Sequence, residues 1–182
     1  MSREWDVPVY AHLLEQPYLN CTRSYPPPDP HVGGGMLALL SPLFPTSPID
    51  VSAHLRELPP DHSIPFMPEF RWIHTPGHVS LWRERDRLLI AGDAIVTTAQ
   101  ESVYASVTQA PEMHGPPMYF TPDWAAARES VCAIEALSPE IVITGHGAAM
   151  RGQQMRKALA ELALDFDTVA VPEDRRDSAV RG

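Results

Sequence analysis

Cysteine is scarce in this sequence. The 182 residues include only two cysteines, Cys21 and Cys132, and this spacing excludes a disulfide framework and a CxxC metal or redox site. We expect Cys132 to lie in a helix and pack in the core, and Cys21 to lie in a loop. Unpaired cysteines are typical of a reducing compartment, so we expect a cytoplasmic location.

Positive charge and long apolar runs are also scarce. The chain has 14 Lys and Arg residues against 23 Asp and Glu residues, and its formal net charge is −9. Without a basic excess it lacks the usual attraction for phosphate backbones, so we expect no nucleic-acid partner. No run approaches the roughly 20 apolar residues of a membrane span, and the N-terminal residues contain no signal-peptide core, so we expect no membrane partner.

The composition that remains is that of one globular domain with long loops. Hydrophobic residues make up 44% and charged residues 20% of the chain, which is ordinary for a folded domain. The 20 prolines are about twice the usual share, and residues 15–50 form a long Pro- and Gly-rich loop. We assign residues 1–172 to the domain and the charged residues 173–182 to a flexible tail.

Short apolar segments alternate with two helical patterns along the chain. Thr121, Pro122 and Asp123 form a typical helix start, with Thr121 as the N-cap and Pro122 at the first helical position. The order of elements predicts an α/β or α+β fold without internal repeats. The expected strands are residues 6–12, 70–73, 79–84, 87–92 and 140–144, and the expected helices are residues 123–137 and 153–171.

Histidines and one aspartate follow the apolar strands directly. His74 and His78 come after FRWI, Asp93 comes after RLLIAG, and His146 comes after IVITG. Polar side chains at several strand ends can converge at one edge of a sheet, and burying them is costly unless something satisfies them. Neutral imidazoles and a carboxylate suit zinc, with iron and manganese as alternatives. The pattern therefore predicts a site for one or two divalent metal ions.

These motifs resemble the metallo-β-lactamase superfamily, closest to its hydroxyacylglutathione-hydrolase-like branch. The resemblance covers residues from about Trp5 to Pro172. It implies an αββα sandwich with the metal site at one edge of its sheets, of which this chain would form the C-terminal half: a mixed sheet with helices on one face, and thus a partial domain. The motifs that carry it are WDVPVYAH, YPPPDP, VGGG, GDAIVTT, HGPPMYFTPDW and GHG.

The resemblance also implies roles for the candidate ligands. Asp93 would bridge two metals and act as the catalytic residue, His146 would bind the second metal, and either His74 or His78 would bind the first. Register with the strand that follows favours His74, which we prefer, whereas register with the strand before it favours His78, so both are kept. The family's HxHxDH motif is absent from this sequence, and HTPGH occurs without the second TPGH that often follows it.

The expected activity is that of a metal-dependent hydrolase whose metal-bound hydroxide attacks an ester or thioester in a small-molecule substrate. His114 and Tyr119 are expected to line the substrate pocket. Because the first half of the fold is missing, we expect a truncated protein with weak zinc binding and little activity alone, whose exposed sheet is covered by a complementary chain or by a second copy in a homo-oligomer. The alternative is a non-catalytic half-domain that acts as an interaction module or is a gene remnant.

Overall fold

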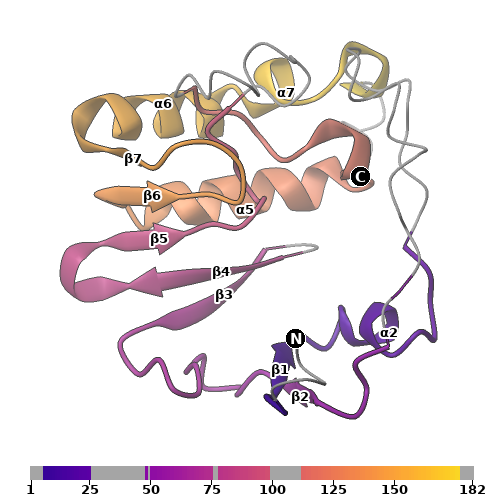
Figure 1. The fold of residues 1–182 in the computed structure, drawn as a ribbon. Coiled ribbons are helices and arrows are strands. Elements are labelled where there is room, and N and C mark those ends of the chain that lie inside the picture. Colours follow the sequence, from indigo (N-terminus) through magenta and orange to yellow (C-terminus); the bar gives the residue numbers. More distant parts are fainter. Residues whose placement is uncertain (1–5, 26–47, 49, 76–77, 99–111, 177–182) are drawn as a thin grey trace.

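The chain forms one larger and one smaller β-sheet with helices beside the larger one (Figure 1). The computed structural model describes residues 6–25, 48, 50–75, 78–98 and 112–176. The strands are β1 (Val9–Ala11), β2 (Leu55–Glu57), β3 (Arg71–Thr75), β4 (His78–Arg83), β5 (Leu88–Ile90), β6 (Ile141–Ile143) and β7 (Met150–Arg151). The helices are α2 (Gln16–Leu19), η2 (Glu84–Asp86), η3 (Met118–Phe120), α5 (Trp124–Ala136), α6 (Gly152–Leu164), α7 (Phe166–Val169) and η4 (Glu173–Arg175).

The larger sheet is mixed, as the sequence predicts. Its five strands lie in the order β3-β4-β5-β6-β7, and every neighbouring pair is antiparallel except β5 and β6, which are parallel. A tight turn joins β4 to β5, in which Arg83 donates two hydrogen bonds to the Asp86 carboxylate and Arg87 adopts a left-handed conformation. A parallel pair needs a long crossover, and here α5 lies within the connection from β5 to β6.

One face of this sheet packs against the helices. Cross-strand pairing places Trp82, Leu89, Val142 and Met150 side by side on that face, and all four are buried in one apolar cluster. The predicted arrangement, a mixed sheet with helices on one face, is therefore confirmed. The helix residues in the same cluster include Val131 and Ile134 of α5, Met155, Leu159 and Leu162 of α6, and Phe166 of α7.

The opposite face of the sheet is apolar but only partly covered by the described residues. Leu81, Ile90 and Ile143 are paired neighbours on this face; Leu81 and Ile90 are half-buried, and Ile143 is 38% exposed. The small parallel sheet of β1 and β2 lies beyond β3 (Figure 1), and the His12 ring that follows β1 stacks on His74 of β3. Among the described residues, this apolar surface is thus only partly covered.

Several local expectations need correction. Asp123, not Thr121, is the N-cap of α5, because the Asp123 carboxylate accepts the Ala126 N–H at 2.9 Å while the Thr121 hydroxyl donates to the Pro117 carbonyl. The final helix is broken at Asp165 into α6 and α7. Cys132 does lie in a helix, but on the exposed side of α5.

Parts of the predicted domain plan stay predictions. Within the expected loop of residues 15–50, α2 is a short helix, whereas residues 26–47 and 49 lie outside the described residues. Within the expected tail, residues 173–175 form η4, and residues 177–182 also lie outside them. None of the helices in the described ranges is long and apolar enough to cross a membrane.

The central strand supplies a stability prediction. Leu89 of β5 is completely buried, whereas Leu164 at the end of α6 is 78% exposed. Leu89→Ala removes the same atoms as Leu164→Ala but leaves a cavity in the core, so we expect a loss of about 2–5 kcal/mol in the free energy of unfolding. Leu164→Ala should change it by less than about 0.5 kcal/mol. Urea unfolding followed by circular dichroism measures both, and equal losses would contradict this packing.

Candidate metal centre

The ends of three strands bring His78, Asp93 and His146 to one edge of the larger sheet. Asp93 lies just after β5 and His146 lies just after β6. Because these two strands are parallel, the segments that follow them leave the sheet at the same edge. The Gly145 N–H donates to the Gly92 carbonyl at 2.8 Å and keeps the two chains together beyond the strands. The first residue of the antiparallel strand β4, His78, reaches the same edge.

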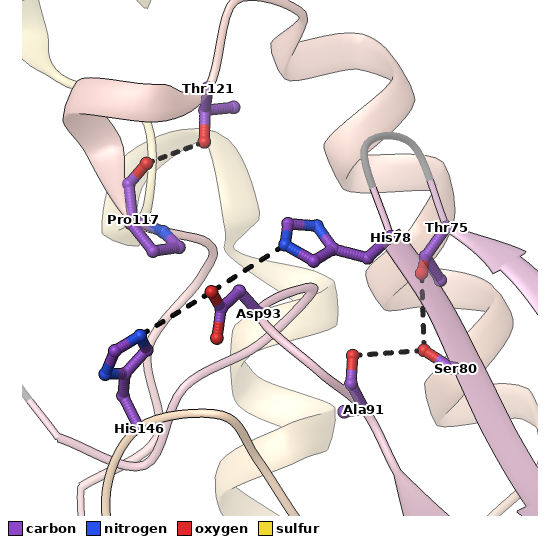
Figure 2. Close-up of polar contacts among 8 residues, drawn as sticks. All are labelled: Thr75, His78, Ser80, Ala91, Asp93, Pro117, Thr121 and His146. Atoms are coloured by element: carbon purple, nitrogen blue, oxygen red, sulfur yellow. Dashed lines mark hydrogen bonds and ion pairs between the residues drawn. The ribbon is translucent and has the colours of Figure 1, made fainter. Parts of the chain in front are cut away.

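Both imidazoles face the same oxygen of the Asp93 carboxylate. The Nε2 atom of His78 lies 3.7 Å and that of His146 lies 3.6 Å from Asp93 Oδ2 (Figure 2). These distances are too long for hydrogen bonds. Two ligands about 2.1 Å from a tetrahedral zinc ion lie about 3.4 Å apart, so each imidazole nitrogen is within a few tenths of an ångström of that separation from the shared oxygen, while the two rings lie on opposite sides of the carboxylate (Figure 2).

The charge state of Asp93 also suits a metal ligand. The His78 imidazole, and then the positive charge that His146 can carry, hold the pKa of the Asp93 carboxyl below its ordinary value, although partial burial acts in the opposite direction. Asp93 is therefore an anion at neutral pH and needs to lose no proton when it binds a cation. The side chains of Asp93, His78 and His146 are 27%, 39% and 54% exposed, which leaves room for water or substrate.

Two glycines give these side chains their space. A Cβ atom on Gly145 would lie 2.1 Å from Asp93 Oδ1, so any side chain there would displace the carboxylate. Gly92 has a φ of +57°, a left-handed conformation that turns the chain immediately before Asp93 and favours glycine. The glycines of GD and GHG thus allow the close approach of backbone to ligand.

His74 lies on the other face of the sheet from His78. In the β3–β4 pair, His78 is opposite Thr75 and His74 is opposite Val79, so the two histidines point to opposite faces. The His74 ring stacks on His12 with 3.9 Å between centroids, and its Nε2 atom has no hydrogen-bond partner among the described residues. Burial, followed by the nearby His12, lowers the pKa of His74. The structure therefore brings His78, and not His74, to Asp93 and His146.

The expected pocket residues lie in the segment before α5. The backbone of His114 pairs with Val96, and its ring Nε2 lies 3.5 Å from the Glu112 carboxylate, with the side chain 27% exposed. The backbone of Tyr119 is part of η3, but its side chain lies outside the described residues. A substrate-binding role for His114 and Tyr119 stays a prediction.

In the described ranges, no group of three or more His, Cys, Asp or Glu side chains is arranged so that it could hold a metal ion as it stands. His78, Asp93 and His146 come together at one edge of the sheet, with each imidazole facing Asp93. Sequence reasoning missed two residues beside this group, Thr97 and Thr144, whose hydroxyl oxygens lie 3.0 Å apart and whose hydroxyls donate to the backbone carbonyls of Ala148 and His146. The run of threonines after GDAIV and the threonine before GHG were the available signals.

The sequence is similar to those of known proteins. The family described as the metallo-beta-lactamase superfamily matches residues 1–146. The probable metallo-hydrolase YflN of Bacillus subtilis is 49% identical over 169 residues, which are 91% of this chain and 64% of YflN. The probable metallo-hydrolase YybB of the same organism is 25% identical over 143 residues, which are 79% of this chain and 54% of YybB. The chain therefore spans somewhat more than half the length of these relatives.

Solved structures of similar proteins are more distant. The metallo-beta-lactamase family protein TTHA1429 from Thermus thermophilus matches with a TM-score of 0.35 and 18% identity, over 53% of this chain and 30% of that one. The apo state of the chemotaxis sensor ODP from T. denticola matches with a TM-score of 0.41 and 20% identity, over 69% of this chain and 56% of that one. The family match over most of the sequence and the identity to YflN show that the chain belongs to the metallo-beta-lactamase superfamily.

Proposed function

We propose that this chain carries the metal-binding edge of a metal-dependent hydrolase that acts on an ester or thioester of a small molecule. The observation that carries the proposal is the convergence of His78, Asp93 and His146, with both imidazole nitrogens within 3.7 Å of one carboxylate oxygen. The names of YflN and YybB, both probable metallo-hydrolases, support the class of reaction. The thioester branch of this proposal rests on the resemblance to hydroxyacylglutathione hydrolases.

The donor set favours zinc over iron and manganese. Two imidazoles and one carboxylate are three protein ligands, the number that leaves one open position on a tetrahedral zinc ion. When bound, zinc supplies Lewis acidity and lowers the pKa of water to about 7. His78 and His146 must both be neutral to bind it, whereas Asp93 provides the negative charge. We therefore propose one zinc ion for this chain.

An arrangement with two ions bridged by Asp93 needs more donors than this group provides. Each ion would then have one histidine and one shared carboxylate. Such ions would be under-coordinated in comparison with the four ligands of typical zinc sites. We propose weak zinc binding and little turnover by the chain on its own, because even a single ion would have only these three protein ligands, and they are 27–54% exposed.

We propose that a partner covers the face of the sheet that the described residues leave partly open. The apolar residues of this face, such as half-buried Leu81 and Ile90 and exposed Ile143, would be covered by a complementary chain or a second copy. We propose a cytoplasmic location because both cysteines are exposed free thiols.

Removal of the central carboxylate tests the metal site. Asp93→Asn keeps the shape of the side chain but removes the charge that two imidazoles face, so we expect the affinity for Zn²⁺ or Co²⁺ to fall by at least about 10-fold. The matched control is Asp167→Asn, which removes an equally charged but exposed group on α7. Titration calorimetry measures both variants, and wild-type affinity in Asp93→Asn would overturn the proposal.

A pair of histidine variants tests which residue of HTPGH is the ligand. His78→Ala removes the ring beside Asp93, so metal affinity should fall as it does in Asp93→Asn. His74→Ala removes a ring on the opposite face of the sheet and should leave affinity within about twofold of the wild type. Cobalt titration followed by visible absorption measures both. The reverse order of effects would show that His74 is the ligand.

A third experiment tests the reaction class. The zinc-loaded protein is incubated with p-nitrophenyl acetate and with an acyl-thioester of glutathione, before and after dialysis against a chelator. We expect slow hydrolysis that disappears with the metal, returns when zinc is added back, and is absent from Asp93→Asn. Hydrolysis that is unaffected by the chelator would contradict a metal-dependent reaction.

A further inference from the structure

His146 sits in a segment with little regular structure to hold it. It lies between β6 and the two-residue strand β7, and its side chain is 54% exposed. Fixing an irregular segment costs about 1–2 kcal/mol of conformational entropy per residue. A ring that must stay beside Asp93 therefore needs hydrogen bonds that fasten the backbone on either side of it.

Thr97 supplies most of these hydrogen bonds. It is completely buried, four residues after Asp93, and its backbone N–H donates to the His146 carbonyl at 3.0 Å. Its hydroxyl donates to the Ala148 carbonyl at 2.7 Å. Thr97 also lies very close to Gly147. A Cβ atom at position 147 would be 2.5 Å from Thr97 Oγ1, so the second glycine of GHG is needed for this approach.

Thr144 completes the arrangement on the other side of His146. Its hydroxyl donates to the His146 carbonyl at 2.7 Å and lies 3.0 Å from the hydroxyl oxygen of Thr97. Each hydroxyl has a single proton. The Thr97 hydroxyl donates to the Ala148 carbonyl and the Thr144 hydroxyl donates to the His146 carbonyl. The His146 carbonyl therefore accepts two hydrogen bonds, one from the backbone N–H of Thr97 and one from the hydroxyl of Thr144.

We propose that Thr97, together with Thr144, is a positioning residue that holds His146 at the distance from Asp93 that metal binding requires. The inference rests on the proposed function, because it gives the threonines a purpose only if His146 is a ligand. A ligand set has to be held within about 0.5 Å of its working geometry. Loss of an outer partner of a metal ligand typically weakens metal binding about 10- to 100-fold.

The test compares Co²⁺ affinity and the visible absorption of the Co²⁺ protein in three variants. Thr97→Val keeps the volume and the backbone N–H but removes the hydroxyl, and we expect it to weaken Co²⁺ binding roughly 10- to 100-fold and to reduce the visible bands. Thr97→Ser restores the hydroxyl and should restore both. The control is Ser130→Ala, which removes a buried hydroxyl that donates to a backbone carbonyl within α5; it should change neither.

A double-mutant cycle separates positioning from general stability. If Thr97 acts through His146, Thr97→Val should have no further effect on Co²⁺ affinity in a His146→Ala background. In the metal-free protein, amide hydrogen exchange at residues 144–148 should be faster in Thr97→Val and normal in Thr97→Ser. An equal loss of affinity with and without His146 would show that Thr97 is structural only and would overturn the inference.

The two ways of failing can be told apart. If the wild type binds no Co²⁺, the proposed function is wrong and this inference falls with it. If the wild type and Thr97→Val bind Co²⁺ equally well while Asp93→Asn does not, the inference alone is wrong. Should Thr97→Val fail to fold, Thr144→Val at a half-buried position carries the same test, with the same loss expected and wild-type affinity as the contradicting result.

Discussion

The parallel pairing of β5 with β6 is the constraint on which the candidate site depends. It makes two distant segments of the chain leave the sheet at the same edge, one with Asp93 and the other with His146. The hydrogen bond from Gly145 to Gly92 continues this pairing past the last strand residues. That backbone arrangement places the Asp93 carboxylate beside the His146 imidazole. The antiparallel neighbour β4 brings His78 to the other side of the carboxylate (Figure 2).

The sequence predicts the fold class and most of this edge because both depend on short-range patterns. Apolar strands followed by Gly-Asp or Gly-His are visible in one dimension, and the structure has strands at all five expected places. Such patterns could not show on which face of the sheet His74 and His78 lie. His74 and His78 belong to two strands of one hairpin, and the side-chain period of two means that a shift of one residue in register reverses their faces.

Other misses also have local physical causes. Thr121 and Asp123 both suit a helix N-cap, and only the geometry of the backbone shows that Asp123 accepts the hydrogen bond of Ala126. Cys132 carries no charge that would signal exposure, yet it lies on the outer side of α5. Thr97 and Thr144 contact each other across 47 positions of sequence, a tertiary contact that no local pattern reveals.

On the proposed function, a metal ion is the reason that these polar groups share one edge of the sheet. X-ray absorption at the zinc edge, measured on the protein with one equivalent of zinc, tests this most directly because it identifies the atoms bound to the metal. We expect two imidazole nitrogens at about 2.0–2.1 Å and oxygen ligands at about 2.0–2.2 Å. A shell of oxygen atoms alone, without the outer scattering of imidazole rings, would contradict the proposed centre.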